Sequence, residues 1–196
     1  MPIPTRAGKL EPRHLETFTD HPLKFMLMTL AVFFCLIGAS VTTAGESGKM
    51  QGMTATHNTI RNQLGIAPLV WSDSLAEYAR ARAIKLAKQG CRMRHGSSGR
   101  YGENLYWASA VRWSNGKRQV QEINARHVTD SWAQEGKDYN SQTKKCRNGA
   151  ICGHYTQMIW KNSKELGCGM AVCADKGQIW VCNYNPPGNF IGQAPY

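Results

Sequence analysis

Cysteine is the residue type whose chemistry is easiest to read in this sequence. The chain has 196 residues and seven cysteines, of which Cys35 falls within a short apolar segment near the N-terminus. The six others are Cys91, Cys146, Cys152, Cys168, Cys173 and Cys182. An even number of cysteines in an exported domain predicts disulfides. Zinc binding by the thiolates is the alternative, and the lack of any CxxC pair disfavours it.

The spacing of two of these cysteines fits a β-hairpin. Residues 168–173 and 179–183 have the pattern of two strands, with a turn at 175–177 between them. Cys168 and Cys182 lie equally far from Asp175, so they could face each other across the hairpin.

The other four cysteines are then expected to form two further links. Cys146 and Cys152 bracket a short loop and can close it. Cys91 and Cys173 are left to join the early helical region to the sheet. This last link closes the longest loop, so chain entropy makes it the most stabilising, at about 4 kcal/mol.

The sequence predicts helices followed by strands, and these elements must position the cysteines. Hydrophobic spacing and capping residues predict three helices, at residues 53–64, 73–89 and 119–135. Residues 91–118 are rich in Gly, Ser and Arg and are expected to form a long loop. A short helix or strand at 154–160 precedes the hairpin. This order predicts an α+β fold in which helices pack on an antiparallel sheet.

The N-terminal segment has the features of a secretory signal peptide. Residues 25–38 are apolar and uncharged, which is too short for a comfortable membrane span, and Lys24 precedes them. Small residues follow, with a cleavage point expected after Ala44. We therefore divide the chain into a signal at 1–44 and one domain at 45–196, and predict a secreted, extracellular protein. Retention of the segment as an uncleaved anchor is the alternative.

The composition is that of a basic globular domain. Charged residues make up 19% of the chain and hydrophobic residues 42%, which excludes a wholly disordered chain and a polytopic membrane protein. Lysine and arginine outnumber aspartate and glutamate by 24 to 13. The basic residues of the second predicted helix and its C-terminal extension could attract an anionic cell-wall or membrane surface, or form a solvated face. Nucleic acid is not an expected partner of an exported, disulfide-bonded protein.

Two segments have a distinctive pattern: GHYTQMIWKNS at 153–163 and IWVCNYNPPGNF at 179–190. They resemble the signature motifs of the CAP superfamily, which includes cysteine-rich secretory proteins, antigen 5 proteins and plant pathogenesis-related group 1 proteins. Further similar segments lie at 57–72, 101–107 and 166–173. The six cysteines and the C-terminal sequence are most similar to the plant branch. The resemblance implies a three-layer α-β-α sandwich with a central antiparallel sheet, and the same three disulfides.

The resemblance also implies a cleft of two histidines and two glutamates. The matching residues in this sequence are His95, Glu103, Glu135 and His154. Such a set can hold a divalent metal, with zinc bound by His95 and His154, move protons, or form a structural hydrogen-bond network. We expect no required cofactor and no catalysis, because the sequence has neither a GxSxG nucleophile elbow nor an evident catalytic cysteine. His57 is interpreted as structural, and His127 is expected at the core or its boundary.

The function that the resemblance implies is defence-related binding of a sterol or another lipid outside the cell. Tyr139 lies on the loop that contributes to a sterol-binding patch in the family. One alternative is a metal-dependent hydrolase or protease that uses the His/Glu cleft. Another is a precursor that releases residues 186–196 as a signalling peptide, unless this tail is a structural strap.

Overall fold

The structure is a computed structural model that describes residues 45–196. The predicted signal peptide at 1–44 lies outside the described residues. None of the helices in the described part of the chain is long and apolar enough to cross a membrane.

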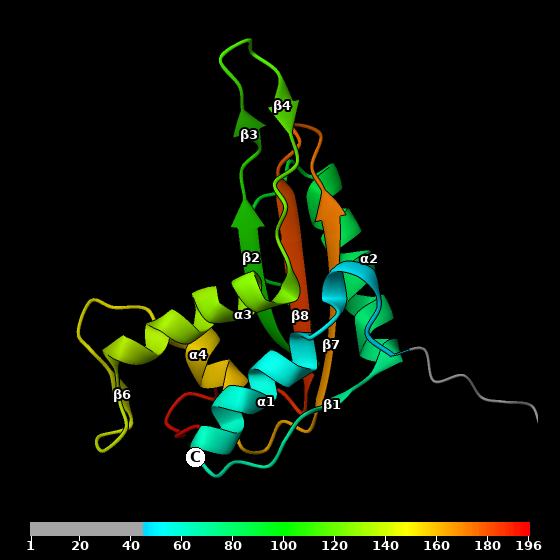
Figure 1. The fold of residues 1–196 in the computed structure, drawn as a ribbon. Coiled ribbons are helices and arrows are strands. Elements are labelled where there is room, and N and C mark those ends of the chain that lie inside the picture. The colour runs from blue at the N-terminus through cyan, green and yellow to red at the C-terminus, as the bar shows by residue number, and fades with distance from the viewer. Residues whose placement is uncertain (1–44) are drawn as a thin grey trace, which may run out of the picture. The chain divides into compact units, whose positions relative to one another are not determined.

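A four-stranded sheet forms the centre of the domain (Figure 1). Its strands are β1 (Val70–Trp71), β7 (Glu165–Val172), β8 (Gln178–Asn185) and β2 (Gly102–Ala108), in that spatial order. The long strands are antiparallel, and the short β1 adds to β7 in the parallel direction. Strand β8 lies between β7 and β2 and is buried from Gln178 to Tyr184, because helices cover both of its faces.

Helix α2 (Asp73–Lys88) covers one face of this sheet. Its buried residues Ala79, Ala83 and Leu86 pack with apolar side chains of β2 and β8. The helix lies so close to β7 that a side chain at Gly167 or Gly169 would clash with the α2 backbone. Glycine at these two positions therefore allows the close approach.

Three helices cover the other face: α1 (Met53–Gln63), α3 (Ala125–Ala133) and α4 (Gly153–Met158). Trp132, Trp180 and Tyr184 are among the largest side chains of the core that they enclose. The domain therefore has the expected three layers, helix on sheet on helix.

The structure corrects the prediction for residues 91–118. The expected loop contains β2, a central-sheet strand, and a two-stranded hairpin of β3 (Val111–Arg112) and β4 (Arg118–Gln119). Strand β2 lacks a regular alternation of buried and exposed residues, because both of its faces are partly covered. The sequence signal for a strand is therefore weak there.

The third predicted helix also begins later than expected. It starts at Ala125, because the Asn124 side chain accepts a hydrogen bond from the His127 backbone N–H and caps the helix. It continues into the 3₁₀ helix η2 (Gln134–Asp138). A small hairpin of β5 (Tyr139–Asn140) and β6 (Lys145–Cys146) follows, and another 3₁₀ helix, η1 (Gly48–Met50), precedes α1.

The three predicted disulfides are confirmed. Cys168 and Cys182 are direct partners in the β7–β8 register, with their Cα atoms 4.1 Å apart. The other two bonds, Cys91–Cys173 and Cys146–Cys152, each join Cα atoms 5.9 Å apart. The first ties the segment after α2 to the end of β7, and the second closes the loop before α4.

Candidate functional site

Glu103 and His95 form the first pair of candidate site residues. The His95 Nδ1 lies 3.0 Å from Glu103 Oε1, which also accepts a hydrogen bond of 3.0 Å from the Gly96 backbone N–H. Arg82 of α2 donates from Nε to the other carboxylate oxygen at 3.2 Å. The carboxylate of Glu103 therefore holds the loop around His95 against α2.

These contacts shift the pKa values of both members of the pair. The hydrogen bond to Glu103 raises the pKa of His95 above its ordinary value. Burial works against ionisation of Glu103, but the hydrogen bonds from His95 and Gly96 and the charge of Arg82 outweigh it and lower the pKa of Glu103. The pair therefore favours a charged glutamate beside a histidine that is more easily protonated.

Glu135 and His154 form the second pair. The Nδ1 of His154 lies 2.6 Å from Glu135 Oε1. The other oxygen of Glu135 accepts the backbone N–H groups of His154 at 2.9 Å and Tyr155 at 3.2 Å. Glu135 thus satisfies backbone donors in the first turn of α4, where no intrahelical partner exists. The imidazole of His154 is stacked on Trp132, with ring centroids 6.0 Å apart.

The two pairs do not merge into one group. In the described residues 45–196, no group of three or more His, Cys, Asp or Glu side chains could hold a metal ion. Glu103 and Asn104 are consecutive in β2, so their side chains leave opposite faces of the strand. Glu103 contacts Arg82 on the α2 side, whereas Asn104 donates to the backbone carbonyl of His154 at 3.0 Å on the other side.

The chemistry available to each pair follows from its hydrogen bonds. Nδ1 of each imidazole contacts a carboxylate, so Nε2 is the nitrogen that could bind a ligand or carry a proton. A metal site would need both imidazoles on one ion, and the geometry joins each only to its own glutamate. No hydrogen bond among the described residues links one pair to the other, and the contacts that are present suit a structural network.

Buried groups that the sequence did not single out surround the second pair. Tyr184 accepts a hydrogen bond of 3.1 Å from the Asn104 side chain and lies 2.9 Å from His57 Nε2. Burial lowers the pKa of His57 to about 4, which keeps this imidazole neutral. His57 is therefore structural, as predicted. His127 is exposed and contacts the Tyr106 hydroxyl at 3.0 Å, so its expected place at the core or its boundary is corrected to the surface.

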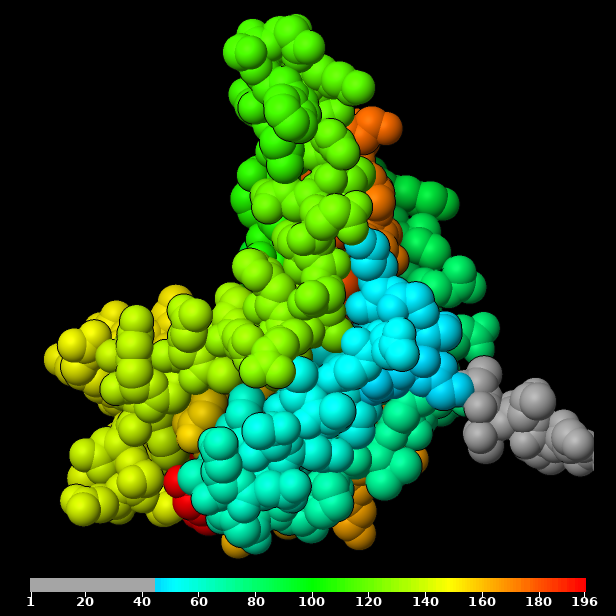
Figure 2. Space-filling model, viewed as in Figure 1, coloured from blue at the N-terminus to red at the C-terminus, as the bar shows by residue number. Residues whose placement is uncertain are grey.

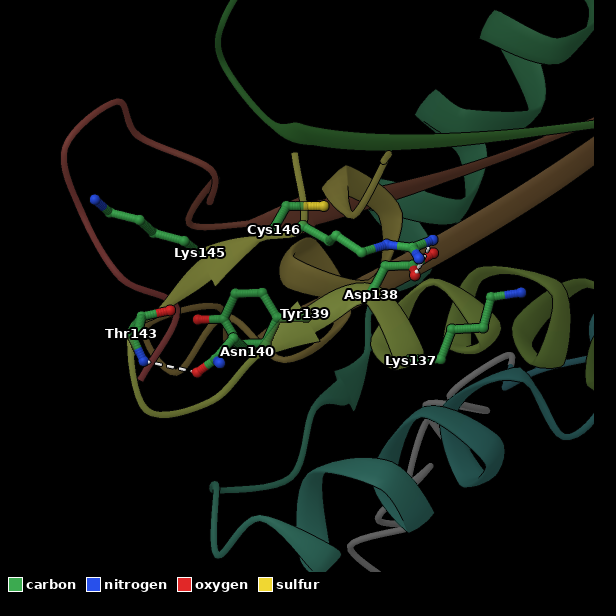
Figure 3. Close-up of a pocket in the computed structure, with 8 residues that line it drawn as sticks. Lys137, Asp138, Tyr139, Asn140, Thr143, Lys145 and Cys146 are labelled. Carbon is green, nitrogen blue, oxygen red and sulfur yellow. Dashed lines mark hydrogen bonds and ion pairs between the residues drawn. The ribbon is translucent and has the colours of Figure 1, made fainter. Parts of the chain in front are cut away.

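Tyr139 lies between two cavities at the β5–β6 hairpin. Figure 3 shows the first, of about 440 Å³, with the Tyr139 hydroxyl directed toward the end of the hairpin where Thr143 lies. The second cavity, of about 320 Å³, is lined by the apolar side chains of Trp160, Phe190 and Pro195 as well as Tyr139. The Tyr139 hydroxyl is buried and has no hydrogen-bond partner among the described residues. The sequence alone had suggested Tyr139, but not the other three.

The C-terminal tail forms one wall of the second cavity. The carbonyl oxygen of Pro195 accepts a hydrogen bond of 2.7 Å from the Lys161 backbone. The Asn189 side chain contacts α4 through the Thr156 hydroxyl at 2.7 Å, and the Phe190 ring packs edge-on against Trp160. These contacts give the tail the character of a structural strap.

Comparison with known proteins agrees with the fold. The family description "CAP: Cysteine-rich secretory protein family" matches residues 54–184. Pathogenesis-related protein 1C of Nicotiana tabacum is 37% identical over 88% of this chain and 94% of its own length. The PR-1 type pathogenesis-related protein of Sambucus nigra is 38% identical over 90% and 98%.

A solved structure has the same architecture. Venom allergen-like protein 4 of Schistosoma mansoni superimposes with a TM-score of 0.59 at 22% identity, over 76% of this chain and 94% of that protein. The family match, the two plant relatives and this shared fold agree with one another. The chain therefore belongs to the CAP family of cysteine-rich secretory proteins.

Proposed function

We propose that this protein is a secreted, defence-related CAP protein that binds a sterol or another lipid at the Tyr139 cavity. The observation that carries the proposal is the buried Tyr139 hydroxyl, which has no hydrogen-bond partner among the described residues and belongs to a residue that lines a cavity together with Trp160 and Phe190. An unpaired buried hydroxyl costs free energy, and a ligand hydroxyl could remove this cost.

The walls of the cavity combine aromatic residues with polar ones, which suits a ligand that has an apolar body and a polar end. The polar lining residues are Lys144, Thr156, Asn189 and Gln193. Trp160 and Phe190 supply aromatic surface, and burial of apolar surface contributes roughly 25 cal/mol per Å². Burial and the neighbouring tyrosines raise the pKa of Tyr139, so its hydroxyl remains protonated and able to donate. A volume of about 320 Å³ falls within the range of small-molecule sites, which begins at roughly 300 Å³.

The location outside the cell is supported by the disulfides. Three disulfides in one domain are typical of proteins from oxidising compartments. Family membership and the names of the plant relatives support a defence-related extracellular role. The expected signal at 1–44 would direct the chain there.

The test compares sterol binding by the wild type with binding by Tyr139→Phe and Tyr139→Ala. Tyr139→Phe removes only the hydroxyl and should weaken binding of a sterol, but not of its 3-deoxy analogue. Tyr139→Ala should weaken binding of both. The matched control is the double variant His95→Ala with His154→Ala, which should bind sterol as the wild type does. Loss of binding in that control, with normal binding by both Tyr139 variants, would place the ligand at the His–Glu pairs instead.

A further inference from the structure

The β3–β4 hairpin projects from the rest of the domain, beyond the end of the central sheet (Figure 2). Every residue from 111 to 119 is exposed. The hairpin pairs Val111 with Gln119 and Arg112 with Arg118, and Trp113 continues the ladder by donating its N–H to the Lys117 carbonyl. A two-stranded hairpin of this kind gains little stability by itself in water.

The two faces of this hairpin differ in chemistry. Successive side chains of a strand point to opposite faces, so Val111 and Trp113 share one face and Arg112 lies on the other. Val111 is 38% exposed and Trp113 is 54% exposed, which leaves an aliphatic and an indole side chain in water. The hairpin is therefore amphipathic, although neither Val111 nor Trp113 belongs to a hydrophobic cluster of the described domain.

The opposite face carries two arginines that do not stabilise the fold. Arg112 and Arg118 are direct cross-strand partners, and like charges in that position are destabilising. Among the ion pairs of residues 45–196, none includes Arg112, Lys117 or Arg118. The sequence has no Asp or Glu from 104 to 121 that could compensate them. An external anion would relieve this repulsion.

We propose that the β3–β4 hairpin docks the protein on a lipid bilayer that contains anionic lipids. An amphipathic element lies in the interface with its apolar face about 5–10 Å into the boundary between headgroups and acyl chains. Val111 and Trp113 enter that boundary, where indole rings are favoured. The opposite face then lies among the headgroups, where Arg112 and Arg118 contact lipid phosphates.

The chemistry of the apolar face favours a bilayer over an acidic polysaccharide. Val111 cannot stack on a sugar ring, but an acyl boundary accepts an aliphatic side chain and an indole equally well. The docking surface is also separate from the Tyr139 cavity, since none of the residues that line that cavity belongs to the hairpin. Docking therefore does not depend on the proposed sterol site.

The test measures binding to phosphatidylcholine vesicles with and without phosphatidylserine, both free of sterol. We expect the wild type to bind only the anionic vesicles, and to dissociate at high salt. The double variant Arg112→Gln with Arg118→Gln should reduce partitioning about thirty-fold at low salt, since each cation near the surface contributes about a factor of five. All of these positions are exposed, so the variants should fold normally.

The matched control is Lys85→Gln with Lys88→Gln, which removes the same charge from α2 and should reduce partitioning much less. Lipids brominated in their acyl chains should quench the emission of the wild type, and Trp113→Phe should lose most of that quenching. Equal losses in the two double variants would overturn the proposal, and so would equal binding to neutral vesicles. Binding to polygalacturonate but to no vesicle would also overturn it, in favour of a polysaccharide partner.

Discussion

The backbone carbonyl of His154 accepts a hydrogen bond of 3.0 Å from Asn104, the residue next to Glu103 in β2. Strand β2 therefore contacts both His–Glu pairs, but from opposite faces. Glu103 binds His95 and Arg82 on the α2 side, and Asn104 contacts the segment held by Glu135 on the other. Hydrogen bonds at each pair therefore link strand β2 to a neighbouring segment, and each pair leads to a testable prediction.

Replacement of Glu135 by Gln should destabilise the fold. The change weakens the contacts of the carboxylate with the His154 ring and with the backbone N–H groups of His154 and Tyr155. Hydrogen bonds to charged groups contribute about 2 kcal/mol, so we expect a fall of that order in the free energy of unfolding. Urea denaturation with intact disulfides measures it. Glu122→Gln, at an exposed ion pair, is the control and should change stability by less than about 0.5 kcal/mol.

Zinc should bind only weakly, and substitution of the histidines should not change its uptake. His95 and His154 each contact their own glutamate, and no larger group of ligands occurs among the described residues. We therefore expect His95→Ala and His154→Ala to match the wild type in zinc titrations followed by calorimetry. A stoichiometric site that disappears in both single variants would instead show that the two imidazoles share one ion, as the family resemblance implies.

Stability should fall as the solution becomes more acidic, because of His57. Its pKa is lowered to about 4 in the folded state, whereas the unfolded chain binds the proton near 6.5. Between these two pKa values the unfolded state binds more protons than the folded state. A fall in pH therefore stabilises the unfolded state relative to the folded state. The neutral His57 contributes about 3 kcal/mol to the free energy of unfolding above pH 6.5, and this contribution is lost as the pH falls toward 4.

The control for this prediction is the pH dependence of a variant without the imidazole. His57→Gln should be less stable at pH 7 but should show a flatter profile between pH 4 and 6.5. His95, whose pKa is raised, has the opposite effect on the pH dependence of stability. The stabilisation that it contributes is present at low pH and is lost as the pH rises through its pKa in the folded state. An unchanged slope in His57→Gln would mean that other groups cause the acid sensitivity.

The C-terminal tail should remain attached and protected. Gly188 donates its N–H to the Gln157 side chain at 3.0 Å, and a side chain there would meet the Trp160 ring at 2.6 Å. Gly188→Ala should therefore displace residues 186–196, speed their amide exchange and weaken sterol binding at the adjacent cavity. Mass spectrometry of secreted wild-type protein should find chains that end at Tyr196. A released peptide that begins at Pro186 would instead support the precursor function.

The features that depend on local spacing could be predicted from the amino-acid sequence alone. Cys168 and Cys182 are equally far from Asp175, so a hairpin that turns at this residue brings them together whatever surrounds it. Helical periodicity likewise located α1 and α2 within one or two residues. The family motifs indicated the two histidines, the two glutamates and Tyr139.

The way in which these residues combine depends on long-range packing and could not be predicted from local patterns. Strand β2 could not be predicted because both of its faces are partly covered. This removes the regular alternation of buried and exposed residues that identifies a strand. With β2 in place, the opposite directions of Glu103 and Asn104 separate the His–Glu pairs. The cavity beside Tyr139 needs Trp160 and Phe190, which are distant in sequence and meet only when the tail folds back. Local sequence fixes which way a side chain leaves the backbone, but long-range packing fixes what it meets.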